Sequence, residues 1–246
     1  MINDKDNQSK FKVVENIEFK KILNNNHLFS YVQLIVDLKS CTNFGYEFLI
    51  RGPVNSRLHA ADKLFYFAKE LGLQRNLEIA SINLHLNNAS NSSLNGCFTI
   101  NLTPTLLLDE EVQNILINYK FPHKIKIEFT EHLNIEDWKP INKHIEKLKC
   151  YGYDFWLDDV GCGYFDLSLV NEIKPDVVKL CIKIISKLNF DESLIKDISQ
   201  LVENVHKYGG MVLAEGVENA NQLTIIKNLN IDLAQGYFFG KPTPLI

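Results

Sequence analysis

The segment of this chain that is most able to do chemistry contains two adjacent carboxylates. Residues 153–157 alternate polar and apolar side chains as a β-strand does, and Asp158 and Asp159 follow directly, ahead of Gly161 and Gly163. Neighbouring acidic side chains repel each other unless a cation or a proton relieves them. The pair therefore indicates either a cation site at the end of a strand or a polar turn that closes the strand.

Strand and helix patterns alternate along the chain after an early hairpin. Residues 29–37 and 45–51 are expected to form the hairpin, and further strands are expected at 97–102, 124–130, 153–159, 176–180, 211–217 and 233–237. Helices are expected at 58–71, 74–86, 103–119, 138–150, 192–208 and 221–229. The third of these helices has Thr103 as its expected N-cap, ahead of Pro104. About eight strands alternating with helices predict an α/β fold with a closed (β/α)8 barrel.

Polar side chains recur at or near the ends of these strands. They are Glu47, Asn101, Glu128, Glu131, Asp158, Asp159, Lys179, Glu215 and Gln235. In a closed parallel barrel the carboxyl ends of the strands meet on one face, where active sites lie. Plainer readings exist: Asn101 as a helix cap, Glu128 as a solvated strand residue, and Lys179 with Glu215 as an ion pair. Delivery of such residues by seven strands to one rim favours a functional site.

Five oxygen donors at this rim suit a divalent cation. They are Glu47, Asn101, Glu128, Asp158 and Asp159. An oxygen-rich set favours Mg²⁺ or Mn²⁺ over zinc, which prefers His and Cys. Two such ions, about 3.5–4 Å apart, activate water for an in-line displacement at phosphorus. Lys179 would then orient the attacking water, and Arg51 would hold a phosphate.

The composition excludes several classes of protein. The chain is 46% hydrophobic and 23% charged, which is ordinary for a globular protein, and its net charge of −4 argues against a nucleic-acid polymer as partner. The five separated cysteines indicate neither a disulfide framework nor a zinc site. No apolar run approaches the roughly 20 residues that span a bilayer, and the N-terminus is too polar for a signal peptide. We therefore expect a cytoplasmic protein, with a polar extension at residues 1–27 and one barrel domain at residues 28–246.

Six motifs in order give the chain a resemblance to a known family. They are EFLIR at residues 47–51, INL at 100–102, IEFTE at 127–131, LDDVGCGY at 157–164, AEGVE at 214–218 and AQGYFFG at 234–240. The first resembles the Glu-Ala-Leu-Leu-Arg signature of EAL-domain proteins, the cyclic di-GMP phosphodiesterases of bacteria. This resemblance implies a modified TIM-like (β/α)8 barrel with one antiparallel strand near the start, which agrees with the early hairpin.

The resemblance also implies a role for each site residue. The metal ligands would be Glu47, Asn101, Glu128, Asp158 and Asp159, which hold two Mg²⁺ or Mn²⁺ ions, with Ca²⁺ inhibitory. The catalytic groups would be Glu47, Lys179, which holds the attacking water, and Glu215. The dinucleotide would contact Gln33, Arg51 and Gln235. Glu131 would anchor the loop after Asp159, which links metal occupancy to the contact between the two subunits of a homodimer.

Four departures from the family pattern bear on activity. Phe48 replaces the alanine of the signature and should point away from Glu47 into packing. The family's aspartate near the catalytic lysine is Cys181 here, so we expect Lys179 to be less firmly oriented and turnover to be slower. The other departures are Leu34 in place of a proline after Gln33, and Val160 and Cys162 in the loop that follows Asp159.

The reaction implied by the resemblance is hydrolysis of cyclic di-GMP, a bacterial second messenger that controls motility and biofilm formation, to linear pGpG. Two alternatives stay open. A weak or inactive member of the family would act as a cyclic di-GMP receptor, which the changes at Cys162 and Cys181 motivate. A regulator that acts through contact with another protein is the second alternative, although such members usually lose several metal ligands and this chain retains all five.

Overall fold

A closed ring of strands forms the centre of the molecule. The computed structural model describes residues 3–130, 137–161, 167–188 and 191–245. Its strands are β1 (Phe29–Asp37), β2 (Thr42–Arg51), β3 (Cys97–Leu102), β4 (Ile125–Phe129), β5 (Asp154–Val160), β6 (Val177–Leu180), β7 (Met211–Ala214), β8 (Leu233–Ala234) and β9 (Thr243–Pro244). Hydrogen-bonded neighbours run in order from β2 to β8 and then to β1, and β1 also pairs with β2, which closes the barrel.

β1 is the strand that runs against its barrel neighbours. It pairs antiparallel with β2 and with β8, whereas each step from β2 to β8 is parallel. The register of the hairpin places Gln33 opposite Glu47, so two residues predicted for the site lie side by side. The short strand β9 pairs with the outer part of β1. The predicted α/β barrel with one antiparallel strand near the start is confirmed.

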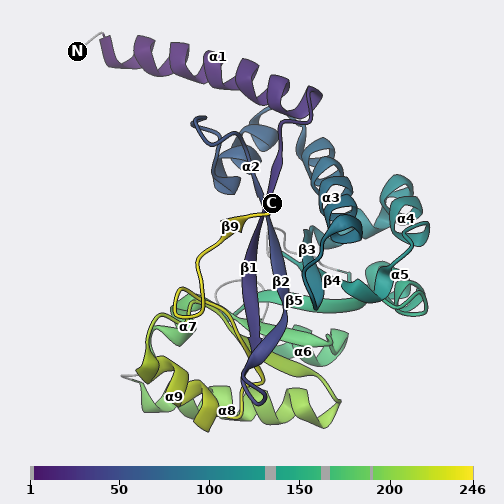
Figure 1. The fold of residues 1–246 in the computed structure, drawn as a ribbon, viewed down its shortest axis with the longest axis vertical. Coiled ribbons are helices and arrows are strands. Elements are labelled where there is room, and N and C mark those ends of the chain that lie inside the picture. Colours follow the sequence, from purple (N-terminus) through teal and green to yellow (C-terminus); the bar gives the residue numbers. More distant parts are fainter. Residues whose placement is uncertain (1–2, 131–136, 162–166, 189–190, 246) are drawn as a thin grey trace.

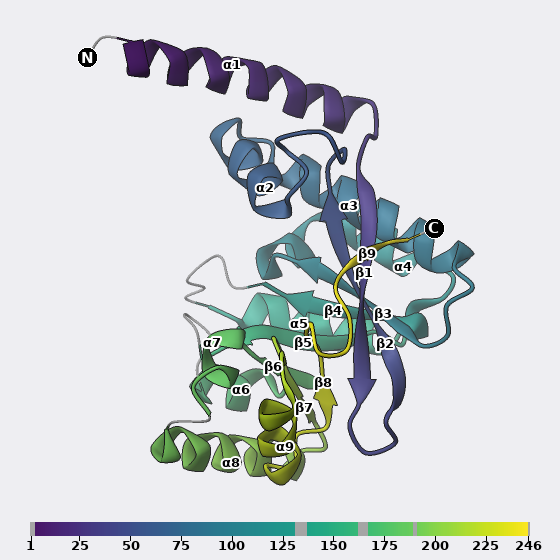
Figure 2. The same cartoon turned by 60° about the vertical axis from the view of Figure 1, so that its left-hand side comes forward.

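Helices surround the barrel (Figure 1) and come into view from a second side in Figure 2. They are α1 (Asn3–Asn24), α2 (Ala61–Glu70), α3 (Gln74–Asn91), α4 (Glu110–Ile117), α5 (Lys139–Lys149), α6 (Leu167–Ile173), α7 (Ile182–Ile185), α8 (Glu192–Lys207) and α9 (Ala220–Asn228), with 3₁₀ turns η1 (Pro104–Leu108) and η2 (Pro122–Lys124). The sequence patterns did not predict α6 and α7. None of the described helices has the length and apolar character needed to cross a membrane.

α1 lies at the opposite end of the molecule from α8 and α9 (Figure 1). Its last turns contribute Phe19 and Ile22 to a buried cluster that also contains Leu64 of α2 and Leu77 of α3. Residues that the sequence assigned to a polar extension therefore include two core side chains. The division of the chain at residue 28 stays a prediction.

The segment after β3 differs from the single helix expected there. A 3₁₀ turn comes first, and α4 begins only after Asp109, whose Oδ1 accepts hydrogen bonds from the backbone N–H groups of Glu111 and Val112. The hydroxyl of Thr103 instead donates a hydrogen bond to Glu78 on α3, at 2.9 Å. Both Thr103 and Asp109 have the chemistry of an N-cap. Thr103 is engaged by Glu78, so Asp109 is the residue that caps α4.

Apolar packing holds the barrel on both sides of its wall. A large cluster lies between the strands and the surrounding helices. A smaller cluster, the barrel plug, joins side chains from five strands across the interior: Ile35, Trp156, Val177, Leu213 and Leu233. Each of these five is at most 1% exposed, so the plug closes the lower part of the barrel to water.

Phe48 packs away from Glu47, as the sequence predicted. It is fully buried and stacks between the rings of Phe98, with centroids 4.8 Å apart, and His85, with centroids 4.9 Å apart. Nε2 of His85 has no hydrogen-bond partner among the described residues. Burial lowers the pKa of His85 to about 3, so the ring is neutral at physiological pH.

The buried imidazole gives a prediction for stability against acid. An unfolded His binds a proton below about pH 6.5, whereas His85 in the folded protein does not until about pH 3. The free energy of unfolding should therefore fall as the pH drops through this window, with His85 contributing up to about 1.4 kcal/mol per pH unit. Urea unfolding between about pH 7 and pH 5 should show a shallower decline for His85→Gln than for the wild type. Parallel declines would contradict a neutral buried His85.

Candidate active site

The predicted site residues form a polar layer directly above the barrel plug. Each of the five plug residues has a polar residue two positions away along the chain. These polar residues are Gln33, Asp158, Lys179, Glu215 and Gln235. Side chains two apart in a strand point to the same face. The polar residues therefore point into the barrel as the plug does. Three further residues join this layer from β2, β3 and β4, namely Glu47, Asn101 and Glu128.

Lys179 of β6 lies at the centre of this layer, with its side chain fully buried. Its Nζ is 2.7 Å from Asp158 Oδ1, 2.9 Å from Glu215 Oε1, 3.0 Å from Glu128 Oε2 and 3.9 Å from Glu47 Oε1. The ion pair that the sequence allowed between Lys179 and Glu215 exists, but as one contact of a larger network. We call these five residues the lysine–carboxylate network.

Burial and mutual repulsion decide how the network is protonated. Burial raises the pKa of Glu128 to about 8, although the nearby Lys179 ammonium opposes the shift. Burial also raises the pKa of Glu215 well above its usual range. Burial alone would lower the pKa of Lys179, but the carboxylates of Asp158, Glu128, Glu215 and Glu47 outweigh it and raise that pKa well above its usual value. The network thus has four carboxyl groups and one ammonium. An additional cation bound there would favour the ionised form of the carboxyl groups.

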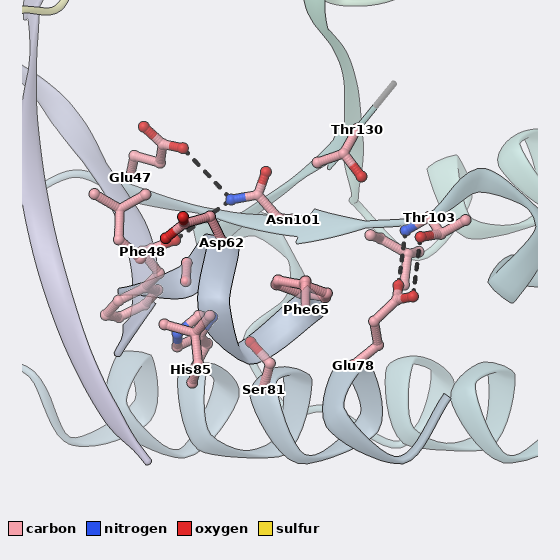
Figure 3. A pocket seen from close by; sticks show the side chains of 14 residues that line it. Glu47, Phe48, Asp62, Phe65, Glu78, Ser81, His85, Asn101, Thr103 and Thr130 are labelled. Atoms are coloured by element: carbon pink, nitrogen blue, oxygen red, sulfur yellow. Dashed lines mark hydrogen bonds between the residues drawn. The ribbon is translucent and has the colours of Figure 1, made fainter. Parts of the chain in front are cut away.

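Carboxamides fix the position of Glu47 from two sides. Gln235 donates from Nε2 to Glu47 Oε2 at 2.7 Å and to Gln33 Oε1 at 3.1 Å. Gln33 in turn donates to the backbone carbonyl of Gly240 at 3.1 Å. On the other side, Asn101 Nδ2 donates to Glu47 Oε1 at 3.4 Å (Figure 3). Asn101 therefore orients Glu47 and is not the helix cap that its plainer reading allowed.

The two adjacent aspartates do not behave alike. The pairing of β5 with β6 is irregular between Leu157 and Val160, and Asp159 has a left-handed backbone with φ of 51°. Such a conformation is unusual for a residue other than glycine. Asp158 contacts Lys179 and is mostly buried, whereas Asp159 is exposed. The sharing of metal ions by both aspartates stays a prediction.

The other predicted positions divide as follows. Arg51 donates a hydrogen bond to the carbonyl of Ile50 at 2.8 Å, and its Cζ lies 5.7 Å from the ring centroid of Tyr31. Glu131 and Cys162 lie outside the described residues, so the role of Glu131 as loop anchor stays a prediction. The role of Arg51 as a phosphate ligand also stays a prediction.

Cys181 does not leave the neighbouring lysine short of partners. Its side chain is fully buried and is disulfide-bonded, a bond that the spacing of the cysteines did not indicate. Lys179 has three carboxylate oxygens within 3.0 Å although Cys181 stands where the family pattern has an aspartate. Lys179 therefore has close partners without an aspartate at position 181, and the slower turnover stays a prediction.

The oxygens of the network suit a hard divalent cation. They are carboxylate and carboxamide oxygens, the ligands that Mg²⁺ and Mn²⁺ prefer. Oε1 of Glu128 is buried and has no hydrogen-bond partner among the described residues. Within the part of the chain that the structure describes, no three acidic, His or Cys side chains are arranged around one point as metal ligands would be. The carboxylates converge on Lys179 Nζ instead, so an ammonium shares the oxygens that a cation would use.

Two cavities open on either side of Glu47. The larger, of about 460 Å³, lies between the barrel and the helices α2 and α3, and its lining includes Glu47, Phe65, Glu78, Ser81, His85 and Asn101. Figure 3 shows Glu47 and Asn101 at one end of it and Glu78, bonded to Thr103, at the other. The smaller, of about 320 Å³, is lined by Gln33, Glu47, Glu215, Glu218, Gln235 and Tyr237 among others.

Several cavity residues escaped the sequence analysis. Glu78, Ser81 and His85 are spaced by three and four residues, which places them on one face of α3. Ser81 and His85 are buried on that face. Polar residues at helical spacing on a buried face were the signal that could have revealed the larger cavity. Glu218 and Tyr237 follow the ends of β7 and β8. In the sequence they were noticed only as members of the motifs AEGVE at 214–218 and AQGYFFG at 234–240.

The chain is similar in sequence to curated cyclic di-GMP phosphodiesterases. The chain is 28% identical to the cyclic di-GMP phosphodiesterase PdeF of Escherichia coli K12 over 96% of its own length and 33% of the length of PdeF. It spans a third or less of the length of PdeF and of three other curated relatives that it matches.

Solved structures show the same fold. An EAL domain protein of Listeria monocytogenes superposes with a TM-score of 0.83, at 24% identity and over 91% of this chain and 92% of that one. A standalone EAL protein of Vibrio cholerae, solved in a form with bound cyclic di-GMP, has a TM-score of 0.76 at 25% identity over 87% and 92% of the two chains. The sequence pattern of the EAL domain matches residues 18–242, and the chain therefore belongs to the EAL domain family.

Proposed function

We propose that this chain is a metal-dependent phosphodiesterase that hydrolyses cyclic di-GMP to linear pGpG and so lowers the level of this second messenger. Membership of the EAL family and the likeness to PdeF support the reaction class. The cytoplasm is the proposed location, and a second copy of the chain is the proposed partner. A regulatory protein partner is not identified.

The observation that carries the proposal is the position of Glu47 between two cavities. One cavity of about 460 Å³ and one of about 320 Å³ share this residue, which is itself a member of the lysine–carboxylate network. A cyclic dinucleotide has two bases joined by a ring that contains two phosphates. A ligand of that shape could place one base in each cavity and a phosphate next to the carboxylates.

Two Mg²⁺ or Mn²⁺ ions are the proposed cofactors. Their ligands would be Glu47, Asn101, Glu128, Asp158 and Asp159. When bound, such ions lower the pKa of water and stabilise the charge that develops on phosphate oxygens. Ca²⁺ is expected to occupy the site without supporting turnover.

The chain's own residues would position the reacting groups. The carboxylates raise the pKa of Lys179 well above its usual value, and its ammonium would orient the attacking water as a hydrogen-bond donor. Glu215, 2.9 Å from Lys179, would hold the ammonium in place. Gln235 would keep Glu47 in its orientation. Arg51 would bind a phosphate oxygen, for which its guanidinium must leave the carbonyl of Ile50.

A receptor that binds cyclic di-GMP without turnover is the alternative reading, motivated by Cys181 and Cys162. The contacts of Lys179 weigh against it, since the replacement at Cys181 leaves three carboxylate oxygens within 3.0 Å of Nζ. Saturable binding without any pGpG, with either ion and at high protein concentration, would favour the receptor over the enzyme.

Removal of a single metal-ligand charge tests the enzyme directly. We expect Glu47→Gln and Asp158→Asn each to lower kcat by at least about 100-fold, because loss of one ligand weakens cation binding and misplaces the reacting groups. Chromatography of pGpG formed with Mg²⁺ or Mn²⁺ gives the rates. Glu203→Gln, which removes an exposed carboxylate from α8, is the matched control and should keep the wild-type rate. Near-normal turnover by Asp158→Asn would show that the ligand assignment is wrong.

The larger cavity gives a prediction about base recognition. Glu78 accepts hydrogen bonds from Thr103 N at 3.0 Å and from Thr103 Oγ1 at 2.9 Å, and its carboxylate lines the cavity. A guanine presents two adjacent N–H donors to such an acceptor, and an adenine does not. Because a hydrogen bond to a charged group contributes about 1.5–3 kcal/mol, Glu78→Gln should weaken cyclic di-GMP binding by roughly 10- to 100-fold.

Calorimetry in Ca²⁺ measures this affinity without hydrolysis. Cyclic di-AMP should bind the wild type more weakly than cyclic di-GMP. Glu78→Gln should reduce the difference between the two affinities. Glu111→Gln, an exposed carboxylate on α4 that pairs with Arg75, is the control and should bind as the wild type does. Unchanged affinity in Glu78→Gln would exclude a base from this end of the cavity.

A further inference from the structure

One buried ammonium holds four carboxylates together in the polar layer. Three carboxylate oxygens lie within 3.0 Å of Lys179 Nζ, and a fourth carboxylate, that of Glu47, lies at 3.9 Å. Other lysines of the barrel make simple pairs, such as Lys126 with Asp154 and Lys149 with Asp176. Among the described residues, Lys179 is the lysine whose side chain is fully buried.

The contacts of this ammonium overlap with the proposed metal ligands. Glu47, Glu128 and Asp158 are ligands in the proposed function, and each is also a partner of Lys179. The ammonium lies 2.7 Å from Asp158, 3.0 Å from Glu128 and 3.9 Å from Glu47, so it engages carboxylate oxygens that a divalent cation would need as ligands. It also repels any cation that approaches the same oxygens.

We propose that Lys179 is an internal competitor of the divalent cations: ions enter the site only as the ammonium gives up its contacts with Glu128, Asp158 and Glu47. This inference rests on the proposed metal dependence and adds to it. Lys179 thereby limits the affinity for ions and restricts full loading to higher ion concentrations. Glu215, which is not among the proposed ligands, keeps the ammonium near the site after the other contacts are lost.

The competition predicts an effect on metal binding that opposes the effect on activity. Lys179→Met removes the charge and retains most of the side-chain length, so the carboxylates repel one another without relief and bind cations more tightly. We expect calorimetry to give at least a tenfold higher affinity for Mn²⁺ than in the wild type, although turnover is lost. The melting temperature of the variant should be lower in EDTA and should rise more on addition of Mn²⁺.

A matched control separates this effect from a general loss of positive charge. Lys126→Met also removes a lysine that pairs with a carboxylate across neighbouring barrel strands. Its affinity for Mn²⁺ should stay within about threefold of the wild type, because Lys126 does not contact the proposed ligands. An equal or weaker affinity in Lys179→Met than in the wild type would overturn the competition.

A measurement on the wild type avoids the risk that Lys179→Met does not fold. The buried ammonium should give a slowly exchanging Nζ resonance in NMR spectra, which Lys179→Arg identifies by its loss. Titration with Mg²⁺, which is diamagnetic, should shift this resonance in a saturable way as contacts are exchanged. A resonance that does not move at saturating Mg²⁺ would overturn the inference.

The outcomes separate this inference from the proposed function. A wild type that binds neither Mg²⁺ nor Mn²⁺ in calorimetry contradicts the metal dependence and the competition together. A wild type that binds ions and hydrolyses cyclic di-GMP, paired with a Lys179→Met variant of unchanged affinity, contradicts the competition alone.

Discussion

The contact between the Lys179 ammonium and its carboxylates is the interaction on which the upper half of the barrel depends. Four acidic side chains from different strands point into a space with little access to water. Without a cation among them they could stay close only by binding protons, because buried like charges repel strongly. The ammonium relieves part of this repulsion, and it does so from the centre of the layer. The same arrangement leaves more carboxyl groups than one ammonium can neutralise, and a divalent cation would supply the missing positive charge.

The barrel plug makes this polar layer possible. Ile35, Trp156, Val177, Leu213 and Leu233 form an apolar floor. The polar residues lie two positions away along the chain, before Ile35 in the antiparallel strand β1 and after the plug residue in the others. Strand geometry alone then places carboxylates and carboxamides above an apolar floor. The antiparallel strand β1 takes part in both layers, since it contributes Ile35 to the plug and Gln33 to the chain of hydrogen bonds that reaches Glu47.

The sequence predicted what depends on period and order along the chain. Strands such as β3 and β4 alternate clearly, and the residues at strand ends could be gathered on one rim because parallel barrels leave little choice. Features that depend on tertiary contacts were not predictable in this way. Thr103 carries the chemistry of an N-cap but bonds Glu78 instead, and α4 begins at Asp109. The different exposure of Asp158 and Asp159 follows from an irregularity in the pairing of β5 with β6, which no sequence pattern indicated.

Closure of the barrel joins segments from opposite ends of the sequence. β1 completes the ring by pairing with β8, about 200 residues away, and Gln235 next to β8 makes the bonds that orient Glu47. Contacts between residues so distant in sequence form late, because a long loop must close before they can contribute. During synthesis on a ribosome, Glu47, Glu128 and Asp158 emerge well before β8, the strand that closes the ring around them. A growing chain therefore carries most of the charges of the site before the ring that buries them can close.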